Sequence, residues 1–374
     1  MPFADLRDFL DELEKQQELV RVSAEVDVRY EIGAICRKVS DAYGPALFFE
    51  RPRGYSNPVV MNVLGTKERL GLALGCEPDA LLRVWNERTK HPIEPTLVST
   101  GPCKENVLLG SDVDLGRFPI PTLNELDGGP YIDLPSIISR DPETGIRNSA
   151  MYRLQVQGKR TLGVLAASYR HLTMQRRKVS GPFPVAIAVG LDPVVTMATV
   201  GPFAFGVDEL AMAGALRGEP VPLVRCETVP LEVPAHAEIV LEGEIHRGET
   251  AEEGPFGEFT GFYGPKGQRT VIRIKAITFR NDLILQGAYC GRPPQETNLI
   301  YSFSIAAGVA NSVPLPGLKQ INVNQSGFNA IVSIEKPCEG YGKMMGLAIL
   351  GTWAGRMLKT VILVDEDIDP FNWD

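Results

Sequence analysis

The sequence predicts a multidomain protein of mixed α+β and α/β class, and three observations support this. The chain has 374 residues, 44% of them hydrophobic, which is enough for roughly two or three domains with substantial cores. Helical and extended patterns alternate over about the first hundred residues, whereas residues 132–285 are dominated by extended patterns. Residues 327–367 then follow a strand–helix–strand order.

The N-terminal region is predicted to be an α/β domain. Apolar residues recur at helical spacing over residues 3–19, with charged residues on the opposite face, so we expect an amphipathic helix there. The next expected elements are strands over residues 46–50 and 57–65 and helices over residues 66–75 and 78–90. The stretch from Pro92 to Pro130 is rich in proline, glycine and aspartate, which predicts an extended linker that packs on another surface.

The middle of the chain is rich in strand patterns. Residues 149–166 contain two extended runs joined by Gln157-Gly158-Lys159, which is typical of a hairpin. Further extended runs follow over residues 184–192, 237–246 and 269–280. So many strands predict a barrel or a strongly curved sheet. One helix interrupts them over residues 207–218, with Asp208 near its start and Gly218 at its end.

The last segment reads as a βαβ unit. A strand over residues 327–336, a helix over 340–358 and a strand over 359–367 should cross over right-handed onto a parallel sheet. The sequence ends shortly afterwards in an acidic turn that contains Pro370. Because such a turn usually leads into a new element, we expect the C-terminal domain to be incomplete.

Composition excludes several classes of protein. A net charge of −8 and a pI near 5.3 argue against a surface for nucleic acid or anionic membrane. No apolar run reaches the roughly 18 residues that a membrane span needs, and the acidic N-terminus does not resemble a signal peptide. The six cysteines are scattered without a CxxC pair, which indicates a reducing, cytoplasmic location rather than a disulfide framework or a cysteine-rich zinc site.

The stretch "EGPFGEFTGFYG", residues 253–264, contains two carboxylates, Glu253 and Glu258, on either side of a Gly-Pro-Phe-Gly turn. Such a turn can bring both side chains toward one cavity, and two close carboxylates raise the pKa of one of them. A carboxyl group with a raised pKa can act as a general acid. The alternative is a solvated hairpin tip without a chemical role, and the spacing alone favours neither interpretation.

Asn148 and Arg153 lie in one extended run, in which residues 149, 151 and 153 share a face. An arginine there can bind a phosphate or carboxylate through two parallel hydrogen bonds. The alternative is half of a surface ion pair, which is the commoner role of a lone arginine in a strand.

His171 lies among basic residues, from Arg170 to Lys178, which indicates an anion site or a metal ligand whose carboxylate partner lies elsewhere. A hydrogen-bonded structural histidine is the alternative, and residue type alone favours it. Glu209 falls in the first turn of the predicted helix, where a carboxylate suits the helix dipole. It would equally suit a hard cation such as Mg²⁺ or Mn²⁺.

Lys343 follows two glycines at a predicted helix start, where backbone N–H groups and an ammonium can meet a phosphate. The signal is weaker than a P-loop, whose pattern is absent. GxGxxG, GxSxG and HExxH patterns are absent too, so nicotinamide, serine-hydrolase and zincin activities lack their usual signatures.

Taken together and in chain order, the residues described above resemble those of the UbiD family of decarboxylases, which depend on prenylated FMN. The stretches that carry the resemblance are "NSAMYR" (148–153), "RHLTM" (170–174), "DELAMAGALRGEPVPLV" (208–224) and "EIVLEGEI…EGPFGEFTGFYG" (238–264). The similarity extends from the N-terminal helix to Asp374. The combination is highly specific, although each stretch alone is weak.

The resemblance implies a set of ligands. A divalent metal, usually Mn²⁺, would tie the cofactor phosphate to Asn148, His171 and Glu209. A potassium ion nearby would take main-chain oxygens around Ala198 and Thr199. The residues that would hold prenylated FMN are Met151, Tyr152, Arg153, Leu165, Ala166, Ala167, Arg170, His171 and, by a looser match, Lys343.

The resemblance also implies a reversible, non-oxidative decarboxylase of an aromatic, heteroaromatic or α,β-unsaturated carboxylic acid. Prenylated FMN would serve as a 1,3-dipole and electron sink. Glu253, Arg153 and Glu258 would form the catalytic network, with Glu258 delivering a proton to the carbon that loses CO₂. Residues 287–304 would line the substrate pocket. Within them Arg292 and Gln295 favour a hydroxylated or heteroaromatic ring.

The implied architecture has three domains. They are an N-terminal α/β domain (1–115), a cofactor-binding split β-barrel of the flavin-reductase type (116–305) and a C-terminal α/β oligomerisation domain (306–374). The implied partners are a flavin prenyltransferase as cofactor source and a second copy of the chain, in a homodimer or larger homo-oligomer.

Three alternatives remain open at this point. The first is a carboxylase of the same family, and the second is a metal enzyme that uses the same asparagine, histidine and glutamate without a flavin. The third is a catalytically silent flavin-binding subunit of a larger complex. Intact Glu253, Arg153 and Glu258 argue against the third alternative, since a silent subunit needs none of them.

Overall fold

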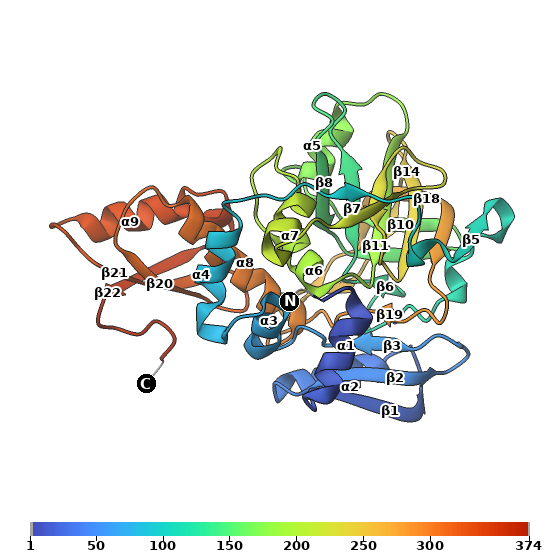
Figure 1. The fold of residues 1–374 in the computed structure, drawn as a ribbon, viewed down its shortest axis with the longest axis horizontal. Coiled ribbons are helices and arrows are strands. Elements are labelled where there is room, and N and C mark those ends of the chain that lie inside the picture. Colours follow the sequence, from blue (N-terminus) through green and yellow to red (C-terminus); the bar gives the residue numbers. More distant parts are fainter. Residues whose placement is uncertain (1–2, 373–374) are drawn as a thin grey trace.

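The computed structural model describes residues 3–372, which form three packed units (Figure 1). In that view the blue N-terminal unit lies below the green and yellow central unit, and the red C-terminal unit extends to one side. Helices α4 (Leu81–Arg88) and α8 (Glu296–Ser312) lie where the C-terminal unit meets the rest. The mixed α and β architecture predicted from the sequence is confirmed.

A four-stranded sheet in the order β1-β2-β3-β19 forms the N-terminal unit. Its strands are β1 (Leu19–Val26), β2 (Ala46–Pro52), β3 (Val59–Met61) and β19 (Leu285–Gln286), and its helices are α1 (Leu6–Lys15), α2 (Glu31–Asp41) and α3 (Lys67–Leu74). Strand β19 returns from the central region and pairs in parallel with β3. The amphipathic helix predicted over residues 3–19 is α1. Asp5 caps it by accepting a hydrogen bond from the Asp8 backbone N–H at 3.0 Å.

The central unit is built on a ten-stranded sheet with the main path β6-β9-β10-β18-β14-β11-β7-β8. Strands β5 and β15 pair with β18 outside this path. The bounds are β5 (Asn106–Leu109), β6 (Tyr131–Ile132), β7 (Ser136–Arg140), β8 (Arg147–Met151), β9 (Leu154–Gly158), β10 (Thr161–Val164), β11 (Phe183–Val189), β14 (Ile239–Ile245), β15 (Thr250–Glu253) and β18 (Gly267–Phe279).

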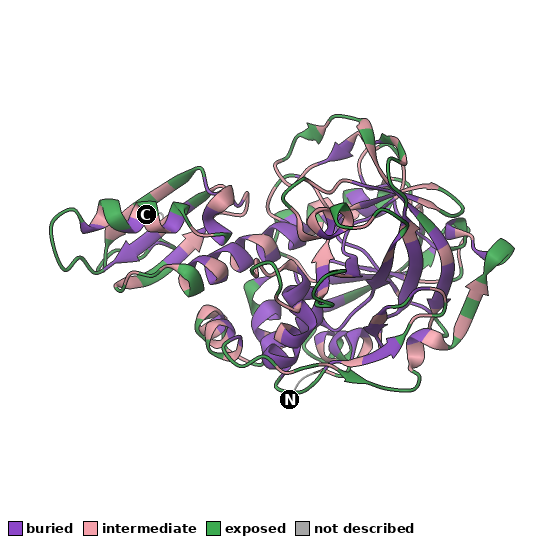
Figure 2. Cartoon of the chain, turned by 90° about the horizontal axis from the view of Figure 1, so that it is seen from above, coloured by how far each residue is buried: buried purple, intermediate pink, exposed green. Residues whose placement is uncertain are grey.

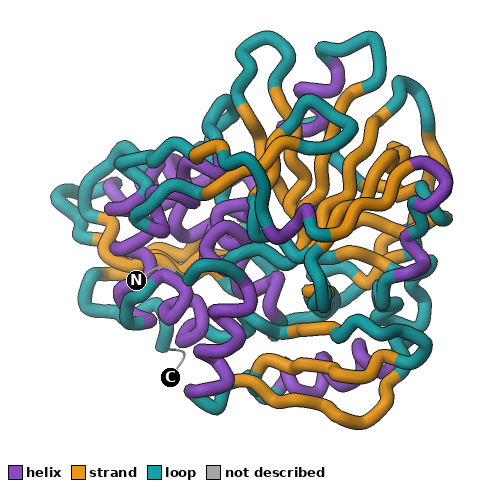
Figure 3. The backbone as a smooth tube through the Cα atoms, turned by 45° about the vertical axis from the view of Figure 1, so that its right-hand side comes forward, coloured by secondary structure: helices purple, strands orange, loops and turns teal. Residues whose placement is uncertain are grey.

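This sheet is strongly curved, as the orange strands of Figure 3 show. Its end strands β6 and β8 do not pair with each other within residues 3–372, so the sheet does not close. The hairpin predicted at residues 157–159 is confirmed, because β9 and β10 pair antiparallel across it. Buried residues concentrate in this sheet and in the helices beside it, whereas the loops are exposed (Figure 2).

Three helices and two small sheets cover the central sheet. They are α5 (His171–Arg177), α6 (Pro193–Val200) and α7 (Glu209–Arg217), with the ladder β13-β12-β4 and the pair β16-β17. The strand bounds are β4 (Thr96–Leu97), β12 (Pro222–Arg225), β13 (Glu232–Pro234), β16 (Phe256–Gly257) and β17 (Tyr263–Gly264). Helix α7 is the one predicted from the sequence. Asp208 caps it at 2.9 Å from the Leu210 backbone N–H, and Gly218 ends it with a φ of 80°.

The C-terminal unit contains β20 (Leu318–Val323), β21 (Asn329–Ile334), α9 (Tyr341–Leu350) and β22 (Thr360–Asp365). Strands β21 and β22 are parallel, so the predicted βαβ unit is confirmed. Strand β20, which the sequence did not reveal, pairs antiparallel with β21. The remaining elements are 3-10 helices at Pro78–Ala80, Pro102–Lys104, Gly110–Asp112, Leu115–Arg117 and Ala354–Met357. Over the described range, none of the helices is both long enough and apolar enough to cross a membrane.

Candidate active site

The break between β8 and β9 positions the first part of the site. β8 ends at Met151 and β9 begins at Leu154, so Tyr152 and Arg153 leave the ladder at this point. Tyr152 is buried. The Arg153 guanidinium reaches the end of β15 and the segment that follows it, about one hundred residues later in the chain.

Arg153 joins the two glutamates of the Gly-Pro-Phe-Gly turn. Its Nε donates to Glu253 Oε1 at 3.0 Å and one Nη to Glu253 Oε2 at 3.3 Å, while the other Nη donates to Glu258 Oε1. The guanidinium also lies 4.5 Å from the centre of the Phe256 ring. Burial lowers the pKa of Arg153, but the hydrogen bond to Glu253 and the charges of both glutamates outweigh it and raise the pKa. Arg153 therefore stays protonated between the two acids.

The two glutamates differ in their surroundings. Glu253 is fully buried and accepts a further hydrogen bond from the Tyr131 hydroxyl at 3.1 Å. The Glu258 side chain is 25% exposed, so it is the acid that a small molecule can reach. The interpretation of a solvated hairpin tip is therefore wrong for Glu253, and the interpretation of a surface ion pair is wrong for Arg153.

Asp127 holds the turn that separates the two glutamates. Its carboxylate accepts hydrogen bonds from the Gly257 backbone N–H at 2.8 Å and from the backbone and side-chain amides of Asn124 at 2.9 and 3.2 Å. Burial raises the pKa of Asp127, although these hydrogen bonds oppose the shift. The backbone next to Glu258 is thus fixed from outside the turn.

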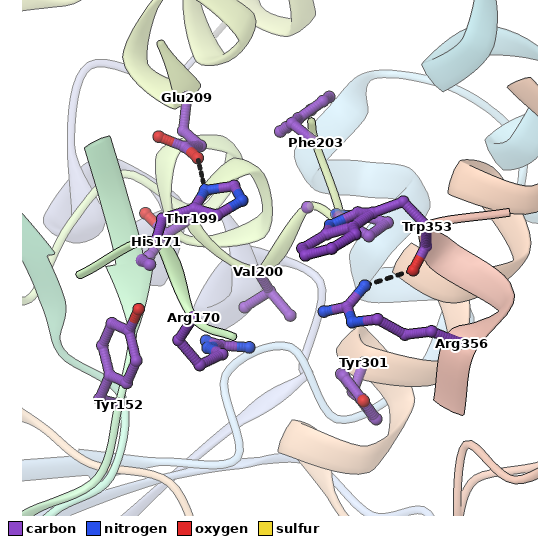
Figure 4. A pocket seen from close by; sticks show the side chains of 13 residues that line it. Tyr152, Arg170, His171, Thr199, Val200, Phe203, Glu209, Tyr301, Trp353 and Arg356 are labelled. Carbon is purple, nitrogen blue, oxygen red and sulfur yellow. Dashed lines mark hydrogen bonds and ion pairs between the residues drawn. The ribbon is translucent and has the colours of Figure 1, made fainter. Parts of the chain in front are cut away.

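A second cluster brings together Asn148, His171 and Glu209. Asn148 lies on β8, while His171 and Glu209 are the first residues of α5 and α7. His171 Nδ1 lies 3.2 Å from Asn148 Oδ1. It also lies 3.9 Å from Glu209 Oε1, as Figure 4 shows. The other oxygen of Glu209 accepts a hydrogen bond from the Ser149 backbone N–H at 2.7 Å, which fixes the carboxylate against β8.

Burial controls the protonation of this cluster. It lowers the pKa of His171 to about 4, and the positive charges of Arg170 and Arg356 act in the same direction. It also raises the pKa of Glu209 to about 8. A neutral imidazole can donate a lone pair to a metal, whereas a buried carboxylate without a cation is costly to ionise.

The residues present fit a divalent cation. His171 Nε2 is buried and has no hydrogen-bond partner among the described residues, and Glu209 accepts a hydrogen bond from the Ser149 backbone N–H. The set of amide, imidazole and carboxylate donors suits a hard or intermediate metal such as Mn²⁺ better than a thiophilic one. No group of three or more histidine, cysteine, aspartate or glutamate side chains within residues 3–372 forms an alternative metal site.

A pocket opens beside this cluster (Figure 4). Its lining residues are Ala150, Tyr152, Arg170, His171, Thr199, Val200, Gly201, Pro202, Phe203, Glu209, Tyr301, Trp353 and Arg356. In the central unit they come from β8, α5, α6, α7 and the adjoining loops. The others come from α8 and from the 3-10 helix at Ala354–Met357 with the residue before it. The pocket is therefore assembled at the boundary between the central and C-terminal units.

Two arginines that have no carboxylate partner within residues 3–372 face this pocket. Arg170 donates to the Met151 carbonyl at 2.9 Å, and Arg356 donates to the Trp353 carbonyl. Arg356 Nε is buried and has no partner within residues 3–372. Burial and the charge of Arg170 lower the pKa of Arg356, with the two tyrosines nearby opposing the shift. Two uncompensated cations beside a metal-type cluster make an anion site, and a phosphate monoester has the matching charge.

The other residues expected around the cofactor divide into two groups. Leu165, Ala166 and Ala167 form the loop between β10 and α5, and the Ala167 carbonyl accepts a hydrogen bond from the Arg170 backbone N–H at 3.0 Å. Lys343 is exposed on α9 and does not line the pocket. The structure thus brings Arg356, rather than Lys343, to the pocket from the C-terminal unit.

Ala198 and Thr199, expected at a potassium site, lie in the last turn of α6. The Ala198 carbonyl accepts a hydrogen bond from the Gly201 backbone N–H at 2.9 Å, and Thr199 lines the pocket. The potassium site stays a prediction.

Residues 287–304 contribute less to the site than the sequence suggested. Arg292 is directed outward and forms an ion pair with Asp41 at 3.1 Å. Gln295 caps α8, where its side-chain oxygen accepts a hydrogen bond from the Thr297 backbone N–H at 2.9 Å. Within this range Tyr301 is the residue that lines the pocket. Sequence reasoning missed Phe203, Trp353 and Arg356, since single aromatic or basic residues in distant segments carry no motif.

Models of three domains of one family match the sequence almost from end to end. The 3-octaprenyl-4-hydroxybenzoate carboxy-lyase N-terminal domain matches residues 10–89, the Rift-related domain residues 96–293 and the C-terminal domain residues 299–374. The chain belongs to the UbiD family. This confirms the resemblance, and it makes the chain an enzyme of the carboxy-lyase class.

Solved UbiD-class structures superimpose over nearly the whole chain. An evolved dimeric form of HmfF from Pelotomaculum thermopropionicum, in complex with prFMN, is 36% identical with a TM-score of 0.93, over 98% of this chain and 87% of that one. Vanillic acid decarboxylase from Sedimentibacter hydroxybenzoicus, in closed form, is 33% identical with a TM-score of 0.93, over 100% and 83%. Apo 3,4-dihydroxybenzoic acid decarboxylase from Klebsiella pneumoniae is 31% identical with a TM-score of 0.88, over 98% and 83%.

Proposed function

We propose that this UbiD-family enzyme uses prenylated FMN to decarboxylate, reversibly and without net oxidation, an aromatic, heteroaromatic or α,β-unsaturated carboxylic acid. One observation carries the proposal: a single stretch, from Asn148 to Arg153, connects the metal-type cluster with the two glutamates that Arg153 binds. A cofactor anchored at one end of this stretch would lie next to an acid at the other.

Asn148, His171 and Glu209 would hold a divalent cation such as Mn²⁺, which would bind the cofactor phosphate. Arg170 and Arg356 would neutralise the remaining phosphate charge. HmfF binds prFMN in one solved structure and FMN in another, which supports a flavin in this pocket. When bound, prenylated FMN supplies the 1,3-dipole and electron sink that decarboxylation requires.

Arg153 and the two glutamates would do the rest of the chemistry. Arg153 would orient the substrate carboxylate, and buried Glu253 would hold the guanidinium in place through its two hydrogen bonds. Glu258, the more exposed acid, would deliver a proton to the carbon that CO₂ leaves. In the reverse direction the same carboxylate would accept that proton.

The proposal also covers the domains, the remaining ligands and the partners of the protein. We divide the chain into an N-terminal α/β domain (1–115), a cofactor-binding split β-barrel (116–305) and a C-terminal α/β oligomerisation domain (306–374). A flavin prenyltransferase would supply the cofactor, K⁺ would bind near Ala198 and Thr199, and Lys343 would play no part in the pocket. The dimeric form of HmfF supports a homo-oligomer.

The test is to produce the protein together with a flavin prenyltransferase and to screen a panel of aromatic, heteroaromatic and α,β-unsaturated acids. We expect a bound flavin with near-UV and visible absorbance, and CO₂ release or solvent-deuterium exchange with at least one acid. A bound flavin with neither activity on any acid would instead support the silent flavin-binding subunit. Activity without a bound flavin would support the metal enzyme.

A further inference from the structure

Asp133 is a buried acid without a partner. It lies between β6 and β7 and is 6% exposed. Neither of its carboxylate oxygens has a hydrogen-bond partner among residues 3–372, and no ion pair involves it there. Buried carboxyl groups are almost always hydrogen-bonded, because leaving one unsatisfied costs about 1–3 kcal/mol. We therefore expect a hydrogen-bond donor from outside the polypeptide to bind this carboxyl group.

The strand register places Asp133 beside Arg153. Ile132 on β6 pairs with Leu154 on β9, and Ser136 on β7 pairs with Met151 on β8. The segment from Asp133 to Pro135 therefore spans the same break that releases Arg153 from the ladder. Asp133 thus lies close to the acid network, although it belongs to a different strand connection.

The charges around Asp133 are mostly negative. Burial raises its pKa well above the usual range, and the carboxylates of Asp127 and Glu258 act in the same direction, while Arg153 opposes them. Burial of its thiol and the charges of Asp133 and Glu258 also raise the pKa of the partly exposed residue Cys290. The hydrogen bonds of Arg153 go to Glu253 and Glu258, and none reaches Asp133. Asp133 therefore lacks a hydrogen-bond donor among residues 3–372.

We propose that Asp133 determines specificity by accepting a hydrogen bond from a ring N–H or hydroxyl group of the substrate. The substrate class is then narrowed to cyclic carboxylic acids that carry such a donor, for example hydroxybenzoic acids or pyrrole-type acids. This inference rests on the proposed function, because it assumes that the ring binds next to Glu258. A carboxyl oxygen accepts a hydrogen bond in either protonation state, so this pairing does not depend on the charge of Asp133.

The first arm of the test compares matched acids on the loaded enzyme. The pairs are hydroxybenzoates against benzoate and pyrrole-2-carboxylate against furan-2-carboxylate, in which the donor is present or absent on a ring of the same size. We expect kcat/KM to favour the donor-bearing acid by at least about tenfold. Asp133→Leu, of similar shape, should abolish this preference, and Asp133→Asn, which keeps an acceptor oxygen, should restore part of it. A preference that is absent in the wild type, or unchanged in Asp133→Leu, overturns the proposal.

The second arm needs no substrate. Because Asp133 has no partner within the polypeptide, Asp133→Leu should leave the Tm of the cofactor-free protein unchanged or raise it. Asp127→Leu, which loses three hydrogen bonds in the same region, should lower the Tm by several degrees. An equal loss in Asp133→Leu would show a structural role and overturn the proposal. A wild-type enzyme that acts on no acid contradicts the proposed function, and the Tm comparison still reports on Asp133 separately.

Discussion

Arg153 shows how much of the site depends on one residue. It is the only cation within residues 3–372 that binds both Glu253 and Glu258, and it neutralises one of their two charges. The removal of one partner from such a buried group leaves an uncompensated charge behind. A planar guanidinium serves two carboxylates at fixed angles, whereas an ammonium is a single point charge.

Arg153→Lys should therefore lower decarboxylation by at least about 100-fold, since it keeps the charge but loses the simultaneous hydrogen bonds to both acids. The matched control is Arg273→Lys on β18. Arg273 is exposed and forms an ion pair with Glu249. Steady-state kinetics on the loaded enzymes checks this. Equal activity of the two variants would remove Arg153 from the site.

The metal-type cluster makes a second prediction about single residues. Glu209→Gln keeps an oxygen for the Ser149 backbone N–H but removes the negative charge, so it should weaken Mn²⁺ binding to the cofactor-free protein by at least about tenfold. Glu219→Gln, an exposed acid just beyond the same helix, should bind Mn²⁺ like the wild type. The electron paramagnetic resonance signal of free Mn²⁺ measures both. Unchanged Mn²⁺ binding in Glu209→Gln would contradict a metal site at Glu209.

The sequence revealed these side chains only through their combination. Asn148, His171 and Glu209 carry weak signals singly, and the structure brings all three within one cluster. Tyr131, Asp127 and Asp133 were not predicted. Their importance comes from contacts with segments more than a hundred residues away, or from the lack of any contact, and neither leaves a local pattern.

At the level of elements, the N-terminus of α8 joins two units through a buried acid. Glu296 is 1% exposed, and its Oε1 accepts a hydrogen bond from the Leu64 backbone N–H at 2.6 Å. Its Oε2 has no hydrogen-bond partner within the described residues. Burial raises the pKa of Glu296 to about 7, against the opposing effects of the Leu64 hydrogen bond and the charge of Arg69.

This shift predicts how stability depends on pH. The folded-state pKa lies above the unfolded value of 4.5, so the folded state favours the protonated acid. The contribution of Glu296 is complete below pH 4.5 and is lost as the pH rises through 7, by up to about 3 kcal/mol. The Glu296→Gln variant should not lose this stability as the pH rises. The control variant Glu68→Gln, changed at an exposed position, should lose it like the wild type. Urea unfolding at pH 5.5 and 8.5 measures the difference. A wild-type pH dependence in Glu296→Gln would contradict the assignment.

The sequence predicted elements with strong local periodicity and missed those without it. Helix α1, helix α7, the β9–β10 hairpin and the terminal βαβ unit all have a clear apolar pattern or turn signal. Helices α6 and α8 do not, because most of their residues are buried on all sides and no polar face marks the period. The two-residue strand β19 is defined only by its partner β3, so local sequence cannot indicate it.

At the level of the whole molecule, the C-terminal unit exposes several large apolar side chains. Its large exposed apolar residues are Met344, Leu347, Leu350, Trp353, Ile362, Ile368 and Phe371. Tyr341, Met345 and Ile349 cover the inner side of α9, so Leu347 and its neighbours form a second apolar face on that helix. Exposed apolar side chains on one face of a helix are typical of protein–protein contacts, and we expect a second copy of the chain to cover them.

Leu347→Glu should weaken self-association, because it places a charge at the centre of that face, where Leu347 is 66% exposed. Leu109→Glu, on an exposed position of β5, should leave association unchanged. Analytical ultracentrifugation over a range of concentrations checks both. An unaltered oligomer in Leu347→Glu would place the interface elsewhere.

The pocket itself depends on how the units are assembled. Trp353 and Arg356 reach it from the C-terminal unit, while His171 and Glu209 belong to the central one. Sequence analysis predicted the order of the units and expected Lys343 of the last unit at the site, but it did not predict that Trp353 and Arg356 would line the pocket. That arrangement arises from packing over long sequence distances.

The most direct test of the central claim is solvent-deuterium incorporation by the loaded Glu258→Gln enzyme. Glutamine has nearly the shape of glutamate but carries no acidic proton, so incorporation and CO₂ release should fall by about 10²–10⁴-fold while the bound flavin keeps its absorbance. Glu252→Gln, an exposed acid of β15 paired with Lys266, should behave like the wild type. Normal turnover by Glu258→Gln would contradict the account, because Glu258 would then not be the proton donor.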